Sequence, residues 1–178
     1  MRIAYRDLLV RNAESADCVQ LAAWWNDGNV MAHAGFPLGL GITADEIRKS
    51  IEGDSDETRR RLMIEYQAHP IGEMSYRILD GNTAEIGIKI CETSCQDKGL
   101  GRILLSMLIK TLFSMGYQKI VLDTNLNNTR AQHVYEMLGF QKRRVNTDAW
   151  QDQLGRAQSS VDYELTPDQF IDHTALQP

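Results

Sequence analysis

Two short segments in the middle of the chain combine residue types that can bind a ligand and transfer protons. The first, residues 96–102, reads Gln-Asp-Lys-Gly-Leu-Gly-Arg and stands directly before a stretch with helical periodicity. Its two glycines permit a tight turn and close approach of a ligand to the backbone. The first turn of a helix adds unpaired N–H groups at the positive end of the helix dipole, which can hold phosphate oxygens. A strand-to-helix turn that merely needs small residues is the alternative interpretation.

The spacing of this first segment differs from two other phosphate-binding loops. Position 104 is leucine, where a dinucleotide-binding fingerprint has its third glycine. The Gly-Lys-Ser or Gly-Lys-Thr of a P-loop does not follow the glycines.

The second segment, residues 128–140, predicts a short helix that ends at Gly139-Phe140. Ala131 and Tyr135 are one helical turn apart, so they share a face on which the alanine leaves room and the phenol can reach a ligand. Taken alone, Tyr135 could equally be a half-buried core residue and Asn128 a helix cap.

Together and in this order, the two segments resemble the GCN5-related N-acetyltransferase family. That family's central motif is Gln or Arg, two residues, Gly, one residue, and Gly or Ala, which Gln96, Gly99 and Gly101 match. Its next helix carries Asn, Ala, Tyr and a terminal Gly-Phe, as does the second segment. The resemblance is strong over residues 83–140 and only general before them.

The resemblance implies an enzyme that transfers an acetyl group from acetyl-CoA to an amine. In such enzymes the glycine turn holds the diphosphate of coenzyme A, the preceding strand pairs with the pantetheine arm, and a backbone N–H near Ile90 stabilises the carbonyl oxygen. Asn128 would bond the pantetheine or cap its helix, and Tyr135 would be the general acid beside the thioester sulfur. The expected cofactor-binding residues are Ile88, Lys89, Ile90, Gln96, Asp97, Lys98, Gly99, Leu100, Gly101, Arg102, Asn128, Ala131 and Tyr135.

Attack of an amine on a thioester requires a base as well as an acid. Glu85, at the entrance of the strand beside the acetyl arm, is the expected base, because many relatives carry an acidic residue there that acts directly or through water. The alternative is a solvated glutamate at a strand end.

The acceptor is expected between the first helices and the sheet. The candidate substrate-binding residues are Trp25, Asp27, His33, Phe36 and Glu73. Their carboxylates could attract a cationic amine, although Asp27 could instead cap a helix and one tryptophan could belong to the core. The Trp-Asn-Asp at 25–27 is similar to the branch with ribosomal-protein N-terminal and aminoglycoside 6'-acetyltransferases. We expect a primary amine of an aminoglycoside- or polyamine-like molecule, with a protein N-terminus or a non-catalytic acyl-CoA-binding module as alternatives.

Composition narrows the class of protein. A formal charge of -5 argues against a nucleic-acid-binding protein, although two basic runs, 59–61 and 142–144, could meet phosphates or be solvated edges. The three cysteines, Cys18, Cys91 and Cys95, lack metal-ligand spacing, so we expect reduced thiols and no metal site. Without an apolar leader or membrane-length stretch, we expect a cytoplasmic protein with no membrane partner. A homodimer, frequent among relatives, stays open.

The length of 178 residues suits one domain, 1–178. The pattern predicts an α/β fold with a mixed, mostly antiparallel twisted sheet and helices on both faces. Strands are expected at 8–11, 62–66, 71–79, 84–90, 119–124, 140–145 and 161–165, and helices at 17–25, 43–51, 100–115 and 129–138. Ser15 is the expected cap of the first helix, 26–29 its break, 35–41 a flexible loop, and His69-Pro70 a turn.

Overall fold

An eight-stranded sheet organises the chain in the order β1-β2-β3-β4-β5-β6-β8-β7. The computed structural model describes residues 1–175, so the last three residues of the predicted domain lie outside the described part. The strands are β1 (Arg2–Tyr5), β2 (Leu8–Asn12), β3 (Arg59–Tyr66), β4 (His69–Asp80), β5 (Thr83–Ile90), β6 (Lys119–Asn125), β7 (Gln141–Gln151) and β8 (Ala157–Leu165). Neighbouring strands are antiparallel except β5 and β6, which are parallel. The predicted mixed, mostly antiparallel sheet is confirmed.

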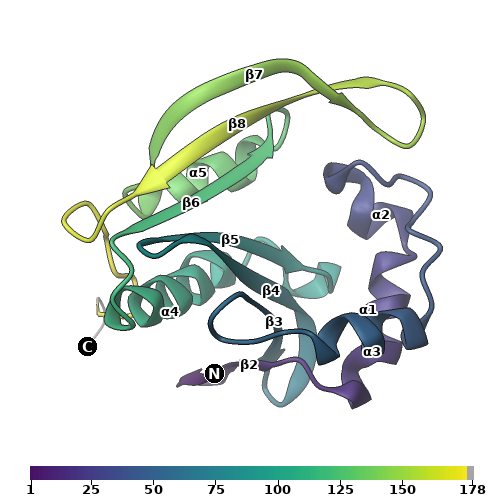
Figure 1. Cartoon of the computed structure of the whole chain (residues 1–178), viewed down its shortest axis with the longest axis horizontal. Helices are drawn as coiled ribbons and strands as arrows, with labels where there is room; N and C mark the ends of the chain where they lie inside the picture. Colours follow the sequence, from purple (N-terminus) through teal and green to yellow (C-terminus); the bar gives the residue numbers. More distant parts are fainter. Residues whose placement is uncertain (176–178) are drawn as a thin grey trace.

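Helices cover both faces of the sheet, as predicted. They are α1 (Cys18–Trp25), α2 (Gly28–Met31), α3 (Ala44–Glu52), α4 (Leu100–Ser114) and α5 (Thr129–Met137) (Figure 1). Successive residues of a strand face opposite sides, so on β3 Leu62 and Ile64 join the core under α4 and α5, whereas Met63 joins a second core with α1 and α3. Within residues 1–175, no helix is both long enough and apolar enough to span a membrane.

The helix-capping residues predicted from the sequence lie at the ends of α3 and α4. At the start of α3, the Thr43 N–H donates to Glu46 Oε2 at 2.8 Å and Thr43 Oγ1 accepts from the Glu46 N–H at 3.3 Å, which is the predicted capping box. The end of α4 is followed by Gly116 with φ +103°, the left-handed conformation expected after a helix.

Of two expectations about the N-terminal helices, one is wrong and one is confirmed. Ser15 does not cap the first helix, because a 3-10 turn, Ser15–Asp17, precedes α1 and is stabilised by Asp17 Oδ2 accepting the Glu14 N–H at 2.8 Å. The expected break after the first helix is confirmed, because α1 ends at Trp25. A new helix, α2, begins within 26–29, where Asp27 accepts the Asn29 N–H at 2.8 Å and caps it.

Several strands also differ from the prediction. β3 begins at Arg59 instead of 62, and β8 begins at Ala157 instead of 161. β1 was not predicted, because the sequence before residue 6 is too short to show a periodicity. The turn before β4 is Gln67-Ala68, both with positive φ, and β4 already begins at His69. β7 continues past residue 145 to Gln151, and its side chains are almost all exposed, so no apolar alternation marks it.

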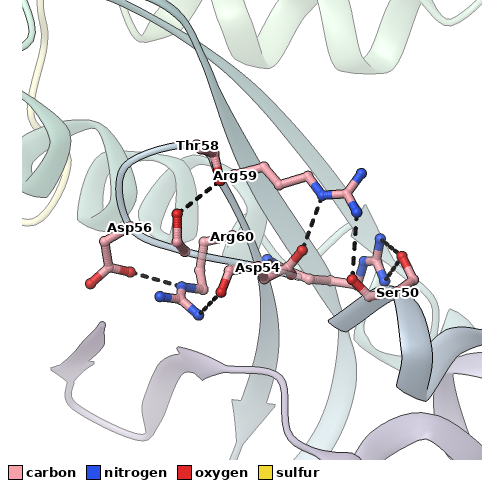
Figure 2. Close-up of polar contacts among 8 residues, drawn as sticks. Ser50, Asp54, Asp56, Thr58, Arg59 and Arg60 are labelled. Atoms are coloured by element: carbon pink, nitrogen blue, oxygen red, sulfur yellow. Dashed lines mark hydrogen bonds and ion pairs between the residues drawn. The ribbon is translucent and has the colours of Figure 1, made fainter. Parts of the chain in front are cut away.

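The basic run 59–61 forms the start of β3, directly after the connection from α3, which Figure 2 shows. Arg59 Nε lies 3.1 Å from Asp54 Oδ1, and Arg60 Nε lies 2.7 Å from Asp56 Oδ1. The Asp54 side chain is 2% exposed, and its other oxygen accepts the N–H of residue 61 at 2.9 Å. These arginines therefore anchor a loop to the sheet and are already paired with carboxylates.

Candidate active site

The sheet opens between β5 and β6. These strands are paired only where Thr83–Glu85 lie beside Lys119–Val121, and beyond this point they diverge (Figure 1). A pocket of about 1180 Å³ occupies the opening and continues toward α1 and α2. The divergence leaves the later residues of β5, from Ile86 to Ile90, along the pocket with a strand edge that faces β6 without pairing.

The glycine turn forms one end of this pocket. Gly99 has φ +73° and precedes the first residue of α4, whose first turn carries no acidic side chain. Among residues 1–175, and apart from its chain neighbours and its own helix backbone, a Cβ at Gly101 would have one heavy atom within 4 Å, Ile90 Cδ1 at 3.9 Å, so the space beside Gly101 is open. Gln96 Nε2 donates to the Ile90 carbonyl at 2.8 Å and ties the turn to the end of β5. An open cradle of helix N–H groups fits a diphosphate.

The predicted cofactor-binding residues of both segments converge on the pocket, with one exception. The residues that line it are Ile88, Lys89, Ile90, Gln96, Asp97, Gly99, Leu100, Gly101, Arg102, Asn128, Ala131 and Tyr135. Lys98 belongs to the turn but is not among the lining residues.

Tyr135 lines the pocket from α5 and is 7% exposed. Its ring packs edge-on against Phe140 at 5.8 Å and Tyr163 at 5.7 Å between centroids. Burial and, secondarily, the negative charge of Asp123 raise the pKa of the Tyr135 phenol to about 12. The phenol therefore stays protonated at neutral pH and can serve as a proton donor.

Asn128 has the helix-capping contact that the sequence left open. Its Oδ1 accepts the Ala131 N–H at 3.2 Å, which satisfies one of the free donors at the start of α5. The cap fixes the end of α5 that borders the pocket.

Asp123 is a pocket carboxylate that the sequence reasoning missed. It lies on β6 beyond the parallel pairing, and because its neighbour Leu122 faces the core under α4 and α5, Asp123 faces the opposite side. The side chain is open to the pocket but flanked by protein, and this desolvation, together with the Glu85 and Asp162 carboxylates, raises its pKa. The available signal for it was an acidic residue directly after the apolar run 120–122 of the strand.

Glu85, the expected base, is not among the residues that line the pocket. Its Oε2 lies 2.6 Å from Arg77 Nη2, on the neighbouring strand β4, and accepts from Arg77 Nε at 2.8 Å. The structure thus places Glu85 beside the site, where its charge acts on Asp123.

Three of the predicted substrate-binding residues line the pocket near α2: Asp27, His33 and Glu73. Asp27 also caps α2. Glu73 is a buried carboxylate, with Oε1 accepting from Trp25 Nε1 at 2.7 Å and from Lys89 Nζ at 3.1 Å. Its charge is therefore largely paired within the protein.

Trp25 and Phe36 are not lining residues. Trp25 packs in the second core and contacts the site through Glu73, while Phe36 lies on the surface with 37% exposure. Trp24 occupies the pocket wall instead and donates to Glu92 Oε1 at 3.0 Å. The sequence does not predict which of the two adjacent tryptophans lines the pocket, because the eight residues of α1 are too few for the apolar pattern to define one buried face.

The tip of the β7–β8 hairpin reaches toward the loop after α2 (Figure 1), and Trp150 from this tip lines the pocket. Gln153 N donates to the Gly35 carbonyl at 2.8 Å, and its side chain accepts from Leu38 N and donates to the Gly39 carbonyl, both at 2.9 Å. Trp150 lines the pocket and covers Gly35, where a Cβ would come within 2.3 Å of its ring. We call these contacts the hairpin bridge. They hold the segment that was expected to be a flexible loop.

A family model described as "Acetyltransferase (GNAT) family" matches residues 41–140, more than half of the chain. The chain belongs to this family. The match includes β5, the glycine turn, α4, Asp123 and Tyr135, so the glycine-turn side of the pocket lies in the matched part, whereas Trp24, Asp27 and Trp150 lie outside it. The resemblance noted in the sequence is thereby confirmed, and the protein is an acyltransferase of the N-acetyltransferase class.

Solved structures share the whole fold at low identity. Spermidine N-acetyltransferase from Vibrio cholerae, in complex with CoA and spermine, has a TM-score of 0.82 and 23% identity over 93% of this chain and 98% of its own. RimL, a ribosomal L7/L12 alpha-N-protein acetyltransferase in complex with coenzyme A, has a TM-score of 0.83 and 18% identity over 95% and 99%. At these identities the likeness shows the fold alone.

One curated relative matches a single segment. "Uncharacterized protein MJ1062" from Methanocaldococcus jannaschii is 35% identical over 72 residues, which are 40% of this chain and 15% of the relative. The chain thus covers only a small part of that protein.

Proposed function

We propose that the protein transfers the acetyl group of acetyl-CoA to a primary amine of a small polycationic molecule, such as a polyamine, by direct attack in a ternary complex. One observation carries the proposal: a single pocket joins an open helix N-terminus suited to a diphosphate with a pair of residues, Asp123 and Tyr135, suited to opposite proton transfers. Acetyl-CoA, when bound, supplies the acetyl group and a thiol leaving group.

The chain's backbone would hold the cofactor. The N–H groups at the start of α4 bind the diphosphate, and the unpaired edge of β5 offers backbone groups to the amides of the pantetheine arm. The backbone N–H of Ile90 would donate to the carbonyl oxygen as negative charge develops there, since the N–H of the following residue, Cys91, is already paired with the Ile71 carbonyl at 2.8 Å. Much of the acceleration comes from holding amine and thioester in a fixed orientation.

Two side chains would move the protons. Asp123 takes the proton from the attacking amine, in place of Glu85, because Asp123 lines the pocket and its raised pKa favours proton acceptance. Tyr135 gives its phenolic proton to the departing thiolate. Glu85 contributes indirectly, since its negative charge helps to raise the pKa of Asp123.

The acceptor side favours a narrow cation. Asp27, Glu92 and Asp123 are acidic residues that line the pocket, and Trp150 of the hairpin bridge adds a bulky ring to its wall. Carboxylates attract ammonium groups, and a linear polyamine fits beside such a ring more easily than a folded protein terminus does. The name of the Vibrio cholerae neighbour, a spermidine acetyltransferase, agrees with this class of acceptor.

Release of free thiol from acetyl-CoA tests the proposal against a panel of spermidine, an aminoglycoside and a peptide with a free N-terminus. We expect the highest kcat/KM with spermidine. A higher kcat/KM with the peptide would refute the polyamine and indicate a protein N-terminus as the acceptor. Binding of acetyl-CoA without turnover of any amine would indicate a non-catalytic acyl-CoA-binding module. Asp123→Asn and Glu85→Gln are compared with the best acceptor: a larger loss of kcat in Glu85→Gln would assign the base to Glu85.

A further inference from the structure

Arg130, a residue of the second segment to which the sequence assigns no role, lines the cofactor end of the pocket. Arg130, in the first turn of α5, places Nη1 3.1 Å from Asp97 Oδ1 and 3.2 Å from Asp97 Oδ2. Its Nη2 donates to Gln96 Oε1 at 3.3 Å. All three residues line the pocket. The contact therefore joins the turn before α4 to the start of α5, two elements that border the same opening.

The carboxylate in this pair stands where an anion must bind. Asp97 belongs to the glycine turn and stands two residues before Gly99, the residue that precedes α4. Its negative charge is therefore close to the N–H groups that are suited to a diphosphate. A second cation is also at hand, because the Arg102 guanidinium lies 3.5–3.8 Å from the position that a Cβ of Gly99 would occupy. Without Arg130, the Asp97 charge would repel the phosphates of CoA.

We infer that Arg130 is a phosphate-binding residue that exchanges its partner: Arg130 is paired with Asp97 in the structure, and a phosphate of coenzyme A takes the place of Asp97 when the cofactor binds. The exchange costs little, because the side chains of Arg130 and Asp97 are 57% and 73% exposed and ion pairs at such exposure contribute little to stability. The gain is larger, since guanidinium and phosphate form a charge-assisted, often bidentate, contact. This inference rests on the proposed use of acetyl-CoA.

The exchange makes the two partners act in opposite directions on cofactor affinity. Removing the positive charge in Arg130→Gln loses the phosphate contact, so the Kd for CoA should rise about five- to twentyfold. Removing the negative charge in Asp97→Asn frees Arg130 and lifts a repulsion, so the Kd should fall about threefold. A purely structural staple between the turn and α5 would give a different result, because breaking it from either side would weaken binding by a similar factor.

Isothermal titration of the full-length protein with CoA measures these constants at fixed, low salt. Arg143→Gln and Asp45→Asn are matched controls with exposed, ion-paired side chains on β7 and α3, and each should change the Kd less than twofold. Weaker binding in both pocket variants, or an unchanged Kd in Arg130→Gln, overturns the inference. Absence of CoA binding in the unaltered protein would instead refute the proposed function.

Titrations with dephospho-CoA and pantetheine locate the phosphate. If the loss in Arg130→Gln disappears with dephospho-CoA, Arg130 meets the 3'-phosphate; if the loss persists, it meets the diphosphate. Pantetheine carries no phosphate, so its affinity should be the same in both proteins. An equal loss with pantetheine would mean that Arg130 acts on the shape of the pocket, which overturns the inference.

Discussion

Replacement of Tyr135 by phenylalanine should separate catalysis from folding. The change removes one oxygen at the pocket and keeps the ring, so the edge-on contacts with Phe140 and Tyr163 remain. We expect the free energy of unfolding to change by less than about 0.5 kcal/mol. Loss of a general acid typically slows a reaction 10²–10⁴-fold, so kcat should fall at least about 100-fold, or about 2.7 kcal/mol of transition-state stabilisation, while the Kd for CoA changes little.

Tyr163→Phe provides the matched control. Tyr163 is fully buried outside the pocket, and its hydroxyl donates to Glu136 Oε1 at 3.1 Å. Loss of this hydrogen bond should cost about 1 kcal/mol, which lowers Tm by about 2–4 °C in a domain of this size, with kcat within twofold of the unaltered protein. Thiol-release kinetics, calorimetric titration and thermal unfolding measure the three quantities. Unchanged kcat in Tyr135→Phe, or a parallel loss of kcat and CoA affinity, would remove Tyr135 from proton transfer.

Three further perturbations have defined outcomes. The raised pKa of Asp123 means that the folded state holds its proton more tightly than the unfolded chain does; activity should therefore fall as the pH drops through this pKa, and Asp123→Asn should abolish that limb of the pH–kcat/KM profile. Because the pKa of Asp123 is higher in the folded state, its ionised carboxylate destabilises the fold, and Asp123→Asn should raise Tm at pH 8. This difference in Tm should vanish toward pH ~4, the ordinary pKa of aspartate, where the carboxyl is protonated in both states. Gly101→Leu should raise the Kd for CoA at least about tenfold in titration and shift Tm little, because the space beside Gly101 is open. Gly35→Ala should lower the free energy of urea unfolding by about 1–3 kcal/mol, because φ is +93° and the new methyl would meet the Trp150 ring. Gly41→Ala is the control: its φ is +67° and its Cβ would meet no atom of residues 1–175 within 4 Å, so its loss measures the backbone strain alone.

The cofactor side of the site could be predicted from the sequence because its signals are local. Leu104, Leu105, Leu108 and Leu112 repeat at helical spacing and are all buried, so α4 was found with its start at the glycine turn. A turn whose function lies in its backbone N–H groups needs only small residues and a following helix. Both are visible within a few residues.

The acceptor side depends on contacts between distant segments, which no local pattern records. Trp150 lines the pocket from β7, a strand whose mostly polar and exposed side chains give no pattern that predicts this position. Of the two adjacent tryptophans, Trp24 and not Trp25 lines the pocket. Asp123 and Glu85 lie on strands that are adjacent only in the folded sheet. Choosing between them required knowing that β5 and β6 diverge after Glu85, and this divergence has no sequence signature.

The hairpin bridge also bears on the order in which the enzyme matures. Gln153 and Gly39 are 114 residues apart, whereas β5, the glycine turn, α4, β6 and α5 follow one another within residues 83–137. Contacts between distant segments form late, because a long loop must be closed first. During synthesis, which proceeds from the N-terminus, the part of the pocket that Trp150 lines remains incomplete until the tip of the β7–β8 hairpin has left the ribosome. A nascent chain could therefore engage coenzyme A before it could select an amine.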